Sequence, residues 1–137
     1  MVYLLYMETK IWYATLIKPT WAPPTWVFGP IWSVLYAIIA VSFGTVFYKV
    51  WQGEIPFWVA VPFILNIIFN ALFTPLQFGL QSNLLAAIDI TLILATLLWA
   101  LYVIYPILPW VLYVNLPYLL WVCIATTLQF TITYLNW

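Results

Sequence analysis

The sequence has 137 residues, of which 68% are hydrophobic, 21% are aromatic and only 4% carry a charge. A soluble domain carries about 25% charged residues, so this composition excludes an ordinary water-soluble protein and predicts one embedded in the lipid bilayer. Three basic and three acidic residues leave no basic patch for a phosphate backbone, which excludes nucleic acid as a partner. Because the chain has no His, we expect no metal centre and no resident cofactor.

Four strongly apolar stretches exceed the roughly 20 helical residues that a bilayer crossing needs. Residues 1–25 precede them as an N-terminal segment and an interfacial loop rich in Trp and Pro, and residues 26–137 form the bundle. Polar and apolar residues do not alternate strictly, which argues against a β-barrel. The sequence therefore predicts an all-α, polytopic transmembrane helix bundle with four spans, at about residues 26–49, 56–78, 83–105 and 109–135.

Breaks inside and between the spans are marked by prolines and capping residues. Pro62 and Pro75 predict a bend or local unwinding near each end of the second span. Ser82 or Asn83 is a plausible N-cap for the third span. We expect the fourth span to be kinked at Pro117.

Helical spacing gathers aromatic and polar side chains on one face of three spans. From the pattern alone, packing residues are the favoured interpretation, and a pocket for a large, flat, apolar ligand is the alternative. The faces comprise Trp32, Tyr36, Ile39 and Phe43 in the first span, Asn66, Asn70 and Phe73 in the second, and Trp121, Ala125, Leu128 and Ile132 in the fourth. Because amides inside lipid need polar partners, we expect the asparagine face of the second span to point into the bundle.

Two further residues have chemistry of their own. Asp89 is the acid inside the third span, and a hydrogen-bonded structural role and proton coupling both remain open for it. Cys123 follows Trp121 by two positions, about 200° around a helix, so we expect it to point away from the face of Trp121.

Residues 18–36 carry the pattern Lys-Pro-x-Trp-x-Pro-Pro-x-Trp-x-Phe-x-Pro-x-Trp-x-x-Leu-Tyr. Together with Leu65-Asn66, Asn70, Asp89 and the run Pro117–Trp121, this pattern resembles the TspO/MBR family. The members are the tryptophan-rich sensory proteins, also called translocator proteins or peripheral benzodiazepine receptors. The resemblance extends from about Trp12 to the C-terminus.

The resemblance implies a five-helix membrane bundle, usually a homodimer, and we expect a prokaryotic cell membrane rather than the mitochondrial outer membrane. It also implies an intramembrane pocket for porphyrins, sterols and benzodiazepine-type ligands, which places the pocket interpretation ahead of mere packing. Carried over position by position, the pocket residues are Tyr13, Trp32, Tyr36, Asn70, Phe73, Trp121, Ala125 and Leu128.

One departure concerns the start of the chain, because only eleven residues precede Trp12 where the family has a whole helix. A misplaced start codon, a truncated sequence and a four-helix variant are the alternatives. In a four-helix variant, one wall of the pocket would come from a partner or from lipid.

The function that the resemblance implies is a sensor or translocator that binds a tetrapyrrole such as protoporphyrin or haem. Catalysis is not the leading expectation, since no acid–base group set accompanies the aromatic residues. A light- and oxygen-dependent enzyme that degrades porphyrin, with Trp32 and Trp121 as the reactive groups, is the first alternative. A small-molecule transporter is the second.

Overall fold

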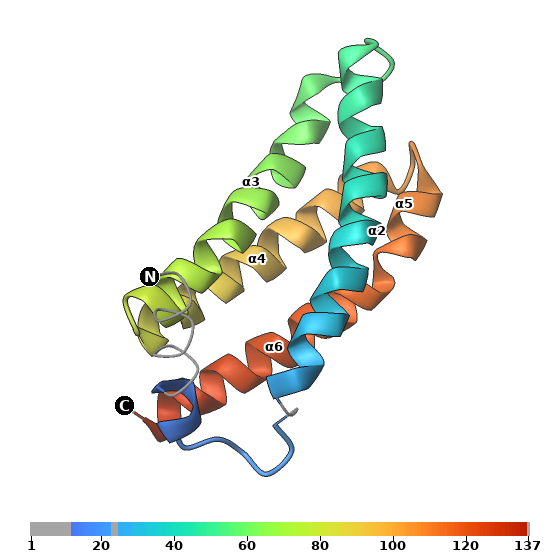
Figure 1. The fold of residues 1–137 in the computed structure, drawn as a ribbon. Helices are drawn as coiled ribbons and strands as arrows, with labels where there is room; N and C mark the ends of the chain where they lie inside the picture. Colours follow the sequence, from blue (N-terminus) through green and yellow to red (C-terminus); the bar gives the residue numbers. More distant parts are fainter. Residues whose placement is uncertain (1–11, 23–24, 137) are drawn as a thin grey trace, which may run out of the picture.

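The computed structural model describes residues 12–22 and 25–136, and every element in this part of the chain is a helix (Figure 1). Four of the helices are long and apolar enough to cross a membrane, which confirms the prediction of an all-α bundle with four spans. The elements are α2 (Thr25–Trp51), α3 (Phe57–Thr74), the π-helical turn η1 (Pro75–Gly79), α4 (Asn83–Ile104), α5 (Pro109–Val114) and α6 (Leu116–Leu135).

Local sequence explains where these helices begin and change. Pro75 lacks the amide hydrogen that would continue α3, and the chain passes there into η1. Ser82 is the N-cap of α4, and its Oγ accepts a hydrogen bond from the Leu85 amide at 3.1 Å. The fourth expected span is interrupted at Asn115 rather than kinked at Pro117, because proline is tolerated in the first turn of the following helix.

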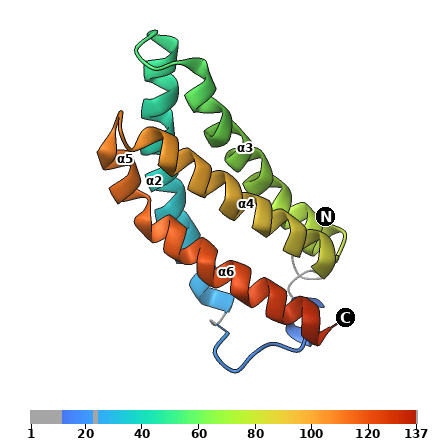
Figure 2. The ribbon, with the colours of Figure 1, turned by 180° about the vertical axis from the view of Figure 1, so that it is seen from behind.

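Helix α4 lies between α3 and α6 and packs along both (Figures 1 and 2). Half of its span is buried, whereas 22% of the span in α2 is buried. Helix α2 meets the rest of the bundle mainly through α3 and α5, at the end near the turn of residues 52–56. The three helices α3, α4 and α6 thus form the compact part of the bundle, and α2 is the span most open to lipid.

The main apolar core joins α2 to this compact part. Phe43 and Phe63 meet edge to face, with ring centroids 4.8 Å apart and planes at 88°. Both rings are buried, together with Val46, Leu97 and Tyr118. This core fixes the position of α2 relative to α3, α4 and α6.

The loop before α2 folds back against the end of α6. The main-chain amide and carbonyl of Ile17 both bond to the side chain of Asn136, at 3.1 and 2.9 Å. Tyr13 packs on Leu128 and Ile132, and the Lys18 ammonium lies 4.6 Å from the centre of the Tyr13 ring. The expectation of a missing family helix concerns residues 1–11, which lie outside the described residues.

Candidate ligand-binding site

The centre of the candidate site is Tyr118, a residue of α6 that is fully buried. Its hydroxyl donates a hydrogen bond to Asn66 Oδ1 at 2.8 Å and accepts one from Asn70 Nδ2 at 2.9 Å. The two asparagines lie one turn apart on α3. The prediction that the asparagine face of α3 points into the bundle is therefore confirmed.

A third helix takes part through Asn66. The amide nitrogen of this residue donates to the main-chain oxygen of Ile93 at 3.0 Å and to Thr96 Oγ1 at 3.2 Å, both on α4. Asn66 is only 1% exposed, so its polar atoms depend on these partners. The result is a chain of hydrogen bonds from α4 through Asn66 and Tyr118 to Asn70, which we call the amide relay.

Trp32 of helix α2 packs its indole ring against Tyr118, the central residue of the amide relay. The rings of Trp32 and Tyr118 meet at an angle of 67° with centroids 6.5 Å apart. Trp32 also contacts Tyr36 on its own helix, at 5.3 Å between centroids. Tyr36 is 53% exposed and lies at the margin of the aromatic group rather than inside it.

The other predicted site residues fall into two groups of apolar contacts. Phe73, Trp121 and Ala125 pack against the main core, as Trp32 does. Tyr13 and Leu128 belong to the second cluster beneath the loop. Leu128 follows Ala125 by one helical turn on α6, so the predicted residues form two groups along one side of that helix rather than one ring of side chains.

One shallow hollow of about 580 Å³ lies beside this side of α6. Of the predicted site residues, only Trp121 is among the residues that line it. Cys123 also lines this hollow, but its side chain is exposed, whereas Trp121 packs against the main core. The two residues therefore point to different sides of α6, as expected from their spacing, and the hollow extends around the helix from one to the other. Its lining residues are Trp21, Trp121, Cys123, Ile124 and Thr127.

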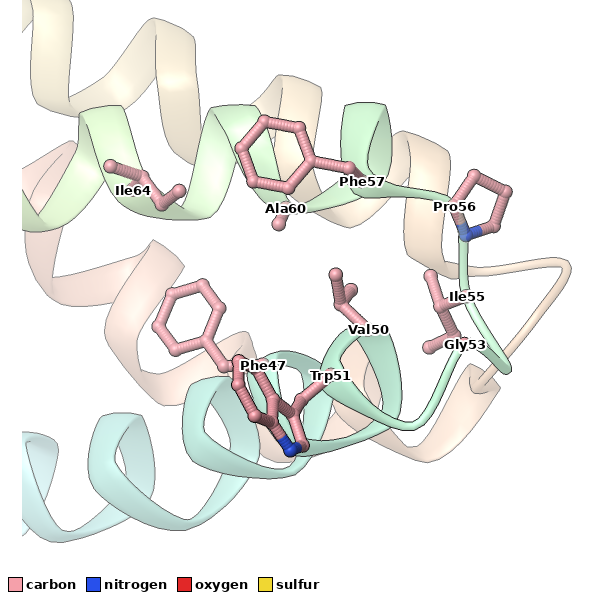
Figure 3. A pocket seen from close by; sticks show the side chains of 9 residues that line it. All are labelled: Phe47, Val50, Trp51, Gly53, Ile55, Pro56, Phe57, Ala60 and Ile64. Atoms are coloured by element: carbon pink, nitrogen blue, oxygen red, sulfur yellow. The ribbon is translucent and has the colours of Figure 1, made fainter.

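A second hollow, of about 690 Å³, lies at the turn between α2 and α3 (Figure 3). Its lining is apolar, and no predicted site residue belongs to it. Val50 of α2 and Ala60 of α3 point toward each other across it (Figure 3). This hollow is therefore a separate feature from the group around Tyr118. The lining comprises Phe47, Val50, Trp51, Gly53, Ile55, Pro56, Phe57, Ala60 and Ile64.

Sequence reasoning did not assign Tyr118 or Trp21 to the site. The signal for Tyr118 was the pair of asparagines, since an amide inside a span needs a polar partner on another helix. The fourth span offers several candidates, including Tyr118, Thr126 and Gln129, and the sequence gives no means of choosing among them. Trp21 belongs to the loop, whose path is not fixed by helical periodicity.

The amide relay and its aromatic neighbours carry no formal charge. Near the loop, burial raises the pKa of the Tyr13 phenol above its usual value, so this group is neutral at physiological pH as well. The arrangement can stack on flat rings through Trp32 and exchange hydrogen bonds through Asn70. It suits a ligand that is mostly apolar and has a polar edge.

Four membrane-length apolar helices, with their amides turned inward and aromatic rings around them, define an integral membrane protein of the helical-bundle class. A family model described as the TspO/MBR family matches residues 2–135, and the chain belongs to this family.

Individual relatives agree with this membership. The tryptophan-rich protein TspO of Bacillus cereus is 36% identical over 95 residues, which cover 69% of this chain and 61% of the relative. The protein of the same name from Chlorobaculum tepidum is 30% identical over 125 residues, which cover 91% of this chain and 79% of the relative. The human translocator protein is 34% identical over 126 residues, which cover 88% of this chain and 72% of the relative. The matched part thus spans about three fifths of the length of the Bacillus cereus protein.

Proposed function

We propose that this protein binds a tetrapyrrole such as protoporphyrin inside the membrane and acts as a sensor or translocator for it. The observation that carries this proposal is the meeting of Trp32, Asn70 and Tyr118, which come from three different helices. An indole supplies a stacking surface for a macrocycle, and a carboxamide supplies a polar contact at its edge. Sterols and benzodiazepine-type compounds, which the family resemblance also implies, share with the macrocycle a mostly apolar body with a polar edge and are further candidate ligands of this site.

Metal-centred binding is not part of the proposal. Tight axial ligation of haem usually depends on His, Cys, Met or Tyr; the chain has no His, and the hydroxyl of Tyr118, the tyrosine at the centre of the site, is already bonded to Asn66 and Asn70. Cys123 lies on the outer surface of α6. Affinity for the metal-free macrocycle should therefore equal or exceed affinity for haem.

A fluorescence titration in detergent tests the proposal. Protoporphyrin should quench tryptophan fluorescence saturably, and Trp32→Phe should reduce both the amplitude and the affinity. Trp99→Phe, on an exposed position of α4, is the matched control and should change the amplitude alone. Quenching that never saturates, or that Trp32→Phe leaves unchanged in affinity, would contradict the proposal.

Transport is a second candidate because of one observation on α4. Asp89 is 3% exposed, and no described residue donates a hydrogen bond to its Oδ2. Buried acids inside membrane spans often belong to proton pathways. Proton-driven uptake of a ligand into vesicles that disappears in Asp89→Asn would favour transport; uptake that is equal in both proteins would exclude this role.

The enzymatic alternative makes a different prediction. If the protein degrades porphyrin in light and oxygen, illuminated complexes should lose the Soret band and yield a discrete product, and Trp32→Phe or Trp121→Phe should prevent this.

The location in a prokaryotic cell membrane stays a prediction, since bacterial and human relatives are similar to this chain to comparable degrees. The homodimer also stays a prediction.

A further inference from the structure

We infer that Asn70 presents a carbonyl oxygen and one N–H to the ligand, so the site selects ligands whose polar edge carries an N–H or O–H donor beside an acceptor. The inference rests on the proposed tetrapyrrole site and adds the chemistry of the ligand group that Asn70 contacts. It follows from three successive hydrogen bonds, each of which fixes the next.

The first step fixes the orientation of Asn66. The main-chain oxygen of Ile93 can only accept a hydrogen bond, so the Asn66 atom 3.0 Å from it must be the amide nitrogen. The carbonyl oxygen of Asn66 then points the other way, to the Tyr118 hydroxyl at 2.8 Å.

In the second step, the orientation of Asn66 determines where the hydroxyl hydrogen of Tyr118 points. Its hydroxyl has a single hydrogen, and Asn66 Oδ1 can only accept, so that hydrogen is used there. The hydroxyl oxygen is left as an acceptor for Asn70, which therefore turns its nitrogen toward Tyr118 at 2.9 Å. A main-chain carbonyl of α4 thus determines which way the amide of Asn70 points.

The third step concerns what remains of the Asn70 side chain. One N–H and the Oδ1 atom have no hydrogen bond to any residue in the part of the chain that the structure describes, and the side chain is partly exposed. Asn70 lies seven residues before Gln77, the end of the span, or about 10 Å along the helix axis. An amide oxygen facing hydrocarbon at that depth is costly, so a polar partner is needed.

The chemistry of that partner follows from the two remaining groups. A primary amide, a lactam or a neutral carboxylic acid has a donor beside an acceptor and pairs with Asn70 through two hydrogen bonds. An ester and a carboxylate can only accept, so either would leave the Asn70 oxygen without a partner. Trp32, which packs on Tyr118, supplies the adjoining ring surface for the macrocycle.

Two synthetic probes separate recognition of a donor from general stacking. Protoporphyrin diamide has donors and acceptors at its edge, protoporphyrin dimethyl ester has acceptors only, and the side chains of neither probe titrate. In fluorescence titrations the wild-type protein should bind the diamide about tenfold more tightly than the ester. The ratio of the two dissociation constants is the readout, because it does not depend on the fraction of protein that is folded.

Three variants locate the source of this preference. Asn70→Ala removes the amide itself and should reduce the ratio to about one while the rings still bind both probes. Tyr118→Phe removes the hydroxyl that orients Asn70, so the amide can turn over, and the ratio should fall without reaching one. Thr96→Val is the matched control. It removes one partner of Asn66 but keeps the Ile93 oxygen that orients it, so the ratio should stay at the wild-type value.

The outcomes separate the two proposals. Equal affinities in the wild-type protein, or a preference that survives both Tyr118→Phe and Asn70→Ala, would overturn the inference, while saturable binding would still support the proposed function. If neither probe nor protoporphyrin itself binds saturably, the proposed function fails, and the inference fails with it.

Discussion

The side-chain nitrogen of Asn115 lies 3.0 Å from Ser42 Oγ, and this hydrogen bond joins α2 to the interruption between α5 and α6. The same nitrogen donates to the main-chain oxygen of Val111 at 2.8 Å. The side chains of Asn115 and Ser42 are both fully buried. A buried amide therefore holds α2, the least buried span, at the position where the fourth span is broken.

Asn115→Ala should lower the free energy of unfolding more than Ser42→Ala does. Each substitution loses the interhelical hydrogen bond, worth about 0.6–2 kcal/mol inside a membrane, and one bond to a main-chain carbonyl four residues earlier. Asn115→Ala in addition empties the buried volume of a whole carboxamide, whereas Ser42→Ala removes a single oxygen atom. Thermal unfolding in detergent should rank the midpoints as wild type, Ser42→Ala, then Asn115→Ala. Thr45→Ala, which loses only a bond to Val41 in the same helix, is the control and should match the wild type. The reverse order of Ser42→Ala and Asn115→Ala would contradict the assignment.

Replacing each of two glycines by alanine should change the stability of the fold in opposite directions. Gly53, in the turn between α2 and α3, has a φ of 77°, where a side chain is strained, so Gly53→Ala should destabilise the fold by about 1 kcal/mol. Gly44 lies inside α2 with open space where an added methyl group would lie, so Gly44→Ala should stabilise the helix by about 0.5–1 kcal/mol. Thermal unfolding of both variants measures this; shifts of the same sign would contradict the explanation.

The number of spans could be predicted from the sequence because a bilayer imposes a length and a composition on each crossing helix. The interruption at Asn115 could not be placed from the sequence alone, since Pro117 is the stronger local signal there. The structure shows that Asn115 bonds to Ser42, which lies 73 positions earlier in the chain. Such a contact depends on how the helices pack and leaves no local trace in the sequence.

The cap of α4 can be tested in the same way. Ser82→Ala removes the acceptor for the Leu85 amide and should cost about 1 kcal/mol of stability. Ser33→Ala, where the hydroxyl donates to the Gly29 carbonyl within α2, should have no measurable effect. Equal unfolding midpoints for Ser82→Ala and the wild type would show that this cap does not stabilise α4.

A pH dependence is expected at the loop. Burial raises the pKa of Tyr13 above its usual value in the folded protein, so the phenol stays protonated longer there than in the unfolded chain. The buried, protonated Tyr13 phenol should therefore contribute its full share to the free energy of unfolding below about pH 10. This contribution should be lost as the pH rises through the pKa that Tyr13 has in the folded protein. Unfolding midpoints measured from neutral to strongly alkaline pH should decline less in Tyr13→Phe than in the wild type. Parallel declines would contradict the prediction.

The candidate site was only partly accessible to sequence reasoning. Helical periodicity placed Asn66 and Asn70 on an inward face, and both do point into the bundle. Periodicity says nothing about which residue on another helix meets them, so Tyr118 was not identified. It also treated Tyr36 as equivalent to Trp32, although Tyr36 is largely exposed while Trp32 packs against the core.

The ten tryptophans of the chain allow the ligand position to be measured directly. In an NMR titration with protoporphyrin, the ring current of the macrocycle should shift the indole N–H resonance of Trp32 most, with a smaller shift for Trp121. Trp51, in the hollow between α2 and α3, should be unchanged. Shifts confined to Trp51, or a Trp32 resonance that does not move at saturation, would contradict binding at the amide relay.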